Sequence, residues 1–307
     1  MDKLLFAFLI CLFVSGCATR TNYLTENDEN INLDSLIRMS SPKQLKKSKQ
    51  HAMNKIRESS IKDTALSIGA QTALAVRAKE IDNELTKHQR YLDKIYDFNA
   101  LVLEHNVMPP VLLEGRNTFN LDDLQSIRIS NRTYRVYKQA RFITTAPNWR
   151  EYLWMDYEPP EKPHPSLLPT NKEEQIVWKE NVAKGWQQGI EQANVILEEG
   201  LARIKQDFNG MILYRKLLAM NMVTPPFVSH TDLGITGDAE EIHIDDRVLR
   251  ITALPALNMN SNEWHAALAK DEEAISKFTK LEKQINQAKI TISSNTWQPV
   301  ISSIGMP

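Results

Sequence analysis

Apolar positions recur with helical spacing in two long segments of the chain. In residues 61–105 they lie three, four or seven positions apart, so they share one face of the predicted helix. This face is formed by Ile81, Leu85, Leu92, Ile95 and Val102. In residues 172–219 the corresponding face is formed by Ile190, Leu197, Leu201, Ile204, Phe208 and Met211. Such spacing is typical of an amphipathic helix. Because proline cannot continue a helix, each helix is expected to end before a proline pair, Pro109-Pro110 or Pro225-Pro226.

Alternating apolar and polar residues predict a β-hairpin after each of these helices. Apolar positions alternate on both sides of Ser130-Asn131 within residues 127–136, and on both sides of Asp245-Asp246 within residues 242–251. Alternation is typical of strands, and Ser, Asn and Asp favour turns. The sequence therefore predicts one hairpin with its turn at Ser130-Asn131 and another with its turn at Asp245-Asp246.

The same order of elements thus occurs twice. A helix is expected to open at Trp149 after the first hairpin, and a last helix opens at Trp264 and runs to about residue 290. Six residues of the first copy recur at an offset of 115, namely Ile127, Ile129, Arg132, Arg135, Trp149 and Leu153. The tripeptide Asp97-Phe98-Asn99 returns as residues 207–209. We predict an α+β fold, a tandem duplication of a module with a long helix, a Pro-Pro break, a hairpin and a helix.

The N-terminus has the features of a lipoprotein signal. Lys3 is followed by eleven apolar residues, which are too few for a membrane-spanning helix of about 20 residues but typical of a secretory signal. The segment ends in Val14-Ser15-Gly16-Cys17, which resembles a bacterial lipobox. Cys17 is therefore the predicted lipidation site, and its covalent lipid is the one prosthetic group expected. The alternative is an ordinary signal peptide with a chance cysteine.

These patterns divide the chain into five segments. They are the signal peptide 1–16, an acylated flexible tether 17–42, a first α+β module 43–155, a proline-rich linker 156–171 and a second α+β module 172–307. Because Ala18 follows the cysteine where an aspartate would suggest inner-membrane retention, the outer membrane is the expected location, with the body facing the periplasm. A basic run after the tether, from Lys43 to Arg57, is interpreted as a solvated helix face, or alternatively as a surface for peptidoglycan, anionic lipid or an acidic partner.

Charge and cysteine content exclude several classes of protein. The 37 basic and 38 acidic residues give a formal net charge of −1, so no global field draws the chain onto nucleic acid. Both cysteines, Cys11 and Cys17, lie in the signal region. The body therefore has no disulfide, zinc-thiolate site or cysteine nucleophile.

The remaining candidate chemistry favours a structural protein over an enzyme. Residues 232–243 resemble a calcium loop but have Gly234 at position three and His243 where a bidentate glutamate is needed. A metal site at His243, Asp245 and Asp246 is disfavoured because the third side chain would oppose the other two. Carboxylates near the first hairpin are interpreted as turn and cap residues; they are Glu104, Glu114, Asp122 and Asp123.

Apolar residues are dense in residues 211–223, which are interpreted as core of the protein's own domain or, alternatively, as an interface. The six tryptophans are likewise expected in the core first and at an interface second; they are Trp149, Trp154, Trp178, Trp186, Trp264 and Trp297.

Long stretches of the body carry a specific sequence pattern. The longest, residues 241–258, reads EIHIDDRVLRITALPALN, and the others are residues 96–99, 101–106, 109–117, 154–157, 210–222 and 228–234. Together these stretches resemble the DotC family of type IVB secretion lipoproteins. The resemblance implies an outer-membrane lipoprotein of a Dot/Icm-type core complex, which acts in effector protein translocation. It implies a DotD-like lipoprotein and a DotH-like channel subunit as partners, the latter brought to the outer membrane. It also implies a ring-forming assembly, acylation at Cys17 with palmitate among the acyl chains, and no catalytic or metal site.

Two rival functions stay open at this stage. One is a lipid-anchored periplasmic cell-wall hydrolase, which would need bound metal or turnover of peptidoglycan. The other is a lipid-carrying chaperone that uses residues 211–223 as a groove.

Overall fold

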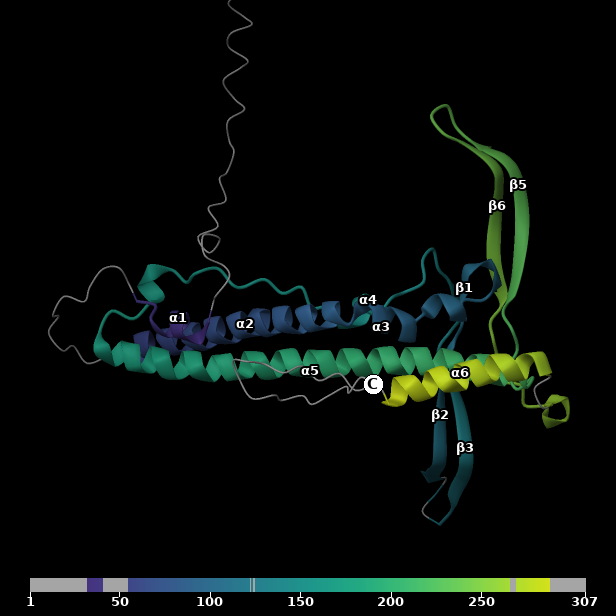
Figure 1. Cartoon of the computed structure of the whole chain (residues 1–307), viewed down its shortest axis with the longest axis horizontal. Coiled ribbons are helices and arrows are strands. Elements are labelled where there is room, and N and C mark those ends of the chain that lie inside the picture. Colours follow the sequence, from purple (N-terminus) through teal and green to yellow (C-terminus); the bar gives the residue numbers. More distant parts are fainter. Residues whose placement is uncertain (1–31, 41–54, 122, 124, 266–268, 288–307) are drawn as a thin grey trace, which may run out of the picture. The chain divides into compact units, whose positions relative to one another are not determined.

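The computed structural model describes residues 32–40, 55–121, 123, 125–265 and 269–287. The chain is a mixed helix and hairpin protein, which confirms the predicted α+β class (Figure 1). Close contacts divide it into two compact units, of which unit 1 holds residues up to Val76 together with residues 158–190, and unit 2 holds the rest. Each unit combines residues from both sides of the proline-rich stretch. The predicted signal peptide, Cys17 and Trp297 lie outside the described residues, as does most of the basic run.

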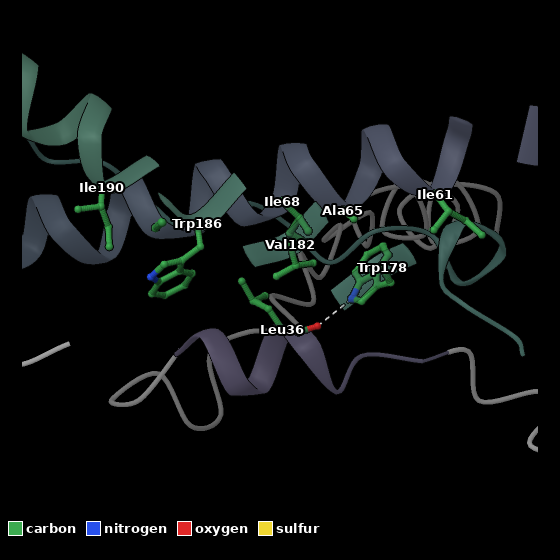
Figure 2. Close-up of a cluster of buried hydrophobic side chains, with 9 residues drawn as sticks. Leu36, Ile61, Ala65, Ile68, Trp178, Val182, Trp186 and Ile190 are labelled. Atoms are coloured by element: carbon green, nitrogen blue, oxygen red, sulfur yellow. Dashed lines mark hydrogen bonds between the residues drawn. The ribbon is translucent and has the colours of Figure 1, made fainter. Parts of the chain in front are cut away.

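Unit 1 is built on two helical segments whose backbones lie very close together. They belong to α2 (Lys55–Lys87) and α5 (Lys172–Ala219). A Cβ added at Gly69 would lie 2.5 Å from the carbonyl oxygen of Val182, and one at Gly185 or Gly189 would overlap the backbone of the facing helix. Only glycine permits this approach. The buried core beside it contains Trp178, Val182, Trp186 and Ile190 from α5 and Ile61, Ala65, Ile68 and Ala73 from α2 (Figure 2).

A short helix within the predicted tether packs onto this core. The helix α1 (Leu33–Ile37) inserts Leu36, which is 2% exposed, into the core of unit 1 (Figure 2). The indole Nε1 of Trp178 donates to the carbonyl oxygen of Leu36 at 2.9 Å, and Gln175 Nε2 donates to that of Ile37 at 2.7 Å. Residues 33–37 are therefore attached to the body.

Arg57 and Glu174 form an ion pair in unit 1, in which the carboxylate is buried and the guanidinium is partly exposed. The Arg57 guanidinium donates to both carboxylate oxygens of Glu174, at 2.5 and 2.9 Å, and to the carbonyl oxygen of Ser166. The backbone N–H of Thr170 also donates to this carboxylate. Glu174 is thus fixed at the start of α5, next to the 3-10 turn η4 (Pro165–Leu167). Arg57, the last residue of the basic run, makes specific contacts here and is not part of a solvated helix face.

Unit 2 surrounds the C-terminal part of α5 with short elements. They are α3 (Gln89–Ile95), the 3-10 turns η2 (Phe98–Leu101), η3 (Glu104–Asn106) and η5 (Ser261–Glu263), the strand pair β1 (Val107–Met108) and β4 (Arg141–Phe142), α4 (Arg150–Leu153) and α6 (Ala269–Gln287). The repeated Asp-Phe-Asn tripeptides meet in its core, where the rings of Phe98 and Phe208 pack edge to face with centroids 4.9 Å apart. The ring of Tyr152 stacks on Phe98 at 5.8 Å.

The predicted helices require three corrections. The segment 61–105 is interrupted at His88, and its helical part ends at Ile95, because the chain then turns to bury Phe98 and Leu101 from a 3-10 turn. The helix expected at Trp149 has only four residues. The last helix begins at Ala269 and not at Trp264, which follows the turn η5.

Two long β-hairpins extend from unit 2 (Figure 1). The first pairs β2 (Val111–Leu121) with β3 (Ile127–Lys138), and the second pairs β5 (Phe227–Gly237) with β6 (Ile242–Ala253). Both predicted turn positions are wrong, because Ser130-Asn131 and Asp245-Asp246 lie inside β3 and β6. The first strand of each hairpin, β2 or β5, lies before the segment whose alternation was used for the prediction. These two strands were therefore not predicted. Asp245 has φ 57°, a conformation that Asp tolerates, at an irregularity in the second hairpin.

Candidate assembly surfaces on the two hairpins

The turns of the two hairpins have the same architecture at the same repeat positions. In the first, the side chain of Asp123 accepts hydrogen bonds from the backbone N–H groups of Gln125 and Ser126, both at 2.7 Å. In the second, Asp238 accepts from Glu240 and Glu241 at 2.8 and 3.0 Å. These backbone hydrogen bonds lower the pKa of both aspartates. Asp238 follows Asp123 by the same 115 residues that relate the predicted repeats, so the turns themselves support the duplication.

The end of the first hairpin carries an apolar cluster on one face, which we call the first end cluster. Phe119 pairs directly with Ile129, and Leu121 pairs with Ile127, so the four side chains share a face. Their exposed fractions are 62%, 59%, 70% and 55%, respectively.

The second hairpin ends in a corresponding group, the second end cluster, formed by Leu233, Ile235, Ile242 and Ile244. Ile235 and Ile244 are each 74% exposed. Ile242 and Ile244 are the repeat equivalents of Ile127 and Ile129. Both copies of the module therefore place large aliphatic side chains in solvent at the far end of a hairpin.

Such exposure is characteristic of a surface that another molecule covers. A two-stranded sheet standing alone is marginally stable in water, and each hairpin here is a separate two-stranded sheet. A contiguous exposed apolar patch marks an interaction site more often than a single exposed aliphatic residue does. The strands also leave open edges, which can accept another strand.

The two hairpins differ in charge. Residues 111–138 contain five Arg and Lys against three Asp and Glu, whereas residues 227–253 contain two against six. Within the first hairpin, Glu114 is paired with Arg116 at 3.3 Å and lies 3.8 Å from Arg132. Within the second, Arg247 lies 3.7 Å from Asp232, while the acidic residues Asp238, Glu240, Glu241 and Asp245 gather near the second end cluster. The first hairpin is thus basic and the second acidic.

The base of the first hairpin is attached to α5 by hydrogen bonds. Lys138 Nζ donates to both carboxylate oxygens of Asp207, at 2.9 and 2.6 Å, and the Tyr152 hydroxyl donates to the same carboxylate at 2.9 Å. Burial and the neighbouring Asp207 carboxylate raise the pKa of Tyr152. These groups line a cavity of about 250 Å³ together with Arg141 and Arg203. Asp207 already accepts three hydrogen bonds, so its observed role is to attach β3 to α5.

The dense apolar segment 211–223 belongs to the core of unit 2. Ile212 and Tyr214 are fully buried, and Tyr214, Leu217 and Val223 form a cluster with Leu112 at the start of β2. Burial raises the pKa of Tyr214 to about 12. The packing supports the prediction of a core segment.

The tryptophans divide between core and surface. Trp149, Trp178 and Trp186 are buried, whereas Trp154 and Trp264 are 45% and 43% exposed. The repeat equivalents Trp149 and Trp264 therefore differ. Trp149 Nε1 donates to Asp93 at 2.6 Å, and Trp264 Nε1 donates to the carbonyl oxygen of Asn258 at 3.0 Å.

The carboxylates singled out from the sequence have local roles. Glu114 pairs with arginines, Asp123 caps its turn, and Asp246 accepts a hydrogen bond from Thr236 at 2.6 Å. His243 lies 3.8 Å from Glu241. Among the described residues, no group of three His, Cys, Asp or Glu side chains is arranged to hold a metal ion. Asp122 lies outside the described residues. In the same part of the chain, no helix combines the length and the apolar character needed to cross a bilayer.

Fold and surfaces together describe an α+β protein with two exposed, oppositely charged hairpins. A family model described as "Type IV secretory system, conjugal DNA-protein transfer" matches residues 55–266, more than half of the chain. The chain therefore belongs to this family of type IV secretion proteins. A comparison with curated proteins found no match.

Proposed function

We propose that this protein is an outer-membrane lipoprotein and a structural subunit of a type IVB core complex. In this role it resembles the DotC lipoproteins and acts with a DotD-like lipoprotein to bring a DotH-like channel subunit to the outer membrane for effector translocation. Membership of the type IV secretion family supports the general role, and the lipobox at Cys17 supports the anchor. The proposed role is structural and not enzymatic.

The observation that carries the proposal is the pair of exposed end clusters. A subunit of a large assembly needs surfaces that are stable only when covered, and eight exposed aliphatic and aromatic side chains on two hairpins provide them. Unit 1, with its close helix contact and the ion pair of Arg57 with Glu174, supplies a packed body that follows the proposed anchor in the sequence.

The anchor limits how far the body lies from the membrane. Acyl chains on Cys17 would hold the chain to the inner leaflet of the outer membrane far more firmly than a single acyl chain does. Fourteen residues separate Cys17 from Asn32, where the described helix α1 is capped, and such a stretch spans at most about 50 Å. Partners bound to the body are therefore concentrated at the membrane.

Cys17→Ser tests the proposal. The variant is expected to leave the body folded but to move both the protein and its channel partner out of the outer-membrane fraction, as measured by membrane fractionation in cells with the whole secretion system. Cys11→Ser is the matched control, because the signal peptide containing it is removed, and it should change nothing. A channel subunit that stays in the outer membrane of the Cys17→Ser strain contradicts the proposal.

The hydrolase alternative makes a different prediction. A metalloenzyme would contain a stoichiometric metal and would release fragments from peptidoglycan. Elemental analysis and a peptidoglycan digestion assay on the purified chain are expected to be negative under the structural proposal, and a positive result in both favours the hydrolase.

A further inference from the structure

The charges on the two hairpins, combined with their apolar ends, identify a specific partner. We infer that the basic hairpin β2–β3 of one copy binds the acidic hairpin β5–β6 of a second copy of this chain. This inference rests on the proposed function as an assembly subunit, and it names the contact that joins neighbouring copies.

Charge complementarity is the first argument. Arg128, Arg132 and Arg135 lie on β3 and are exposed, and Glu240, Glu241 and Asp245 are exposed near the end of the second hairpin. A basic hairpin beside another basic hairpin, or an acidic one beside an acidic one, would bring like charges together at a cost. Pairing of unlike hairpins is thus favoured over pairing of like ones.

The end clusters supply the second argument. Each hairpin carries four large apolar side chains in solvent, so a contact between unlike hairpins covers both clusters at once. A contact that covered only one cluster would leave the equivalent residues of the other repeat exposed. The duplication thus provides two complementary surfaces on a single chain.

The geometry of such a contact has a consequence for assembly. A contact between two different surfaces of identical subunits is head-to-tail, and it generates a closed ring when the rotation closes and a filament when it does not. Each copy binds one neighbour through its basic hairpin and another through its acidic hairpin. Every contact along the assembly is therefore the same.

Engineered cysteines test the contact directly, because the mature body of the chain has no thiol beyond the lipidated Cys17. Full-length lipidated protein with Phe119→Cys and protein with Ile235→Cys are mixed in mild detergent and oxidised. The expected product is the mixed disulfide between residues 119 and 235. Asn120→Cys is the matched control for Phe119→Cys, because residue 120 is exposed but lies on the other face of β2, and it should give far less product.

Charge reversal provides a second readout. Arg128 lies opposite Asn120 and Arg132 lies opposite Arg116, on the face away from the first end cluster, so these two residues act through the net charge of the hairpin and not through direct contact. Arg128→Glu/Arg132→Glu makes this hairpin acidic and is expected to reduce the mixed disulfide about tenfold, as is Glu240→Lys/Glu241→Lys. Combining all four changes in both cysteine variants leaves residues 111–138 with three basic and five acidic residues and residues 227–253 with four of each. The repulsion between two acidic hairpins in the Arg128→Glu/Arg132→Glu variant is thereby removed, and part of the product should return. Circular dichroism checks that each variant remains folded.

The outcomes separate this inference from the proposed function. A mixed disulfide that is lost when Arg128 and Arg132 are reversed and partly regained on the combined change supports the inference. Disulfides only between like positions, or none while the protein still recruits the channel subunit to the outer membrane, overturn the inference and leave the proposed function standing. Failure of outer-membrane localisation contradicts the proposed function instead.

Discussion

The helix contact of unit 1 and the hairpin ends of unit 2 place their apolar side chains in opposite environments. In unit 1, glycines bring two helices into backbone contact, and Trp178 and Ile61 beside them are fully buried. At the hairpin ends, Ile235 and Ile244 remain 74% exposed. The difference shows which apolar residues stabilise the isolated chain and which are available for another molecule.

The same contrast holds for polar groups. The side chain of Glu174 in unit 1 is 4% exposed and accepts hydrogen bonds from Arg57 and Thr170. Most acidic side chains of the second hairpin are instead exposed to solvent. Substitutions in unit 1 are therefore expected to change folding, and substitutions at the hairpin ends are expected to change assembly.

The largest expected effect is that of Gly189→Val. Its side chain would overlap the backbone of Ala70, and neither helix can relax without losing the buried core beside it. The free energy of unfolding should fall by several kcal/mol, enough to prevent folding of unit 1. Chemical denaturation measures this, with the exposed neighbour Gln188→Val as control. A fully stable Gly189→Val protein would contradict the close helix contact.

Phe208→Ala should have the next largest effect. Phe208 is fully buried and packs against Phe98 and Tyr96, so truncation leaves a cavity and should cost about 3–5 kcal/mol. Phe119→Ala makes the same chemical change at a 62% exposed position and should cost under about 0.5 kcal/mol. Thermal unfolding of the two variants measures both losses, and equal losses would contradict the assignment of Phe208 to the core and Phe119 to the surface.

Arg57→Ala is expected to destabilise unit 1 by about 2 kcal/mol, because it leaves the Glu174 carboxylate buried without its cation. Burial alone would raise the pKa of Glu174, but hydrogen bonds from Arg57 and Thr170 and the charge of Arg57 together hold it below its ordinary value of 4.5. The ion pair therefore stabilises the fold fully above about pH 4.5. This stabilisation is lost as the pH falls through the lowered pKa of Glu174.

The pH dependence gives a control for this ion pair. Unfolding free energies measured from about pH 6 to about pH 3 should fall more steeply for the native chain than for Glu174→Gln, which cannot titrate. Identical slopes in the two proteins would show that this pair does not contribute.

The smallest effect on stability is expected for Phe119→Ser/Ile129→Ser. Both side chains are more than half exposed, so the melting temperature of the isolated chain should change by no more than a few degrees. Scanning calorimetry measures it. A large drop would mean that the first end cluster stabilises the chain itself and is not reserved for a partner.

Helical periodicity predicted α5 at its observed bounds. Its 48 residues have a continuous apolar face, and the signals that end the helix lie close to it in the sequence. The hairpins were only half predicted. Their alternating strands β3 and β6 were recognised, but the turns were assigned to Ser130-Asn131 and Asp245-Asp246, because these residue types favour turns although here they lie within the strands. The actual turns were signalled by Asp123 and Asp238, which cap backbone N–H groups two and three residues ahead.

The candidate surfaces were not predictable from the sequence alone. An Ile at position 235 has the same residue type as one at position 190, and only the fold places the first in solvent and the second in a core. The pairing of Arg57 with Glu174 joins residues 117 positions apart, which no local pattern indicates. Tertiary contacts decide such cases, because burial depends on which segments meet.

The mass of the native particle that contains this protein tests whether the hairpin ends join it to a large assembly. Outer membranes from cells with the whole secretion system are extracted in mild detergent, and the particle mass is measured for the native chain and for Phe119→Ser/Ile129→Ser. We expect a large multi-subunit particle for the native chain and release of the folded, membrane-anchored variant as a much smaller species. A native chain that behaves as a single copy, or a variant that remains in the large particle, would contradict the role of the hairpin ends in assembly.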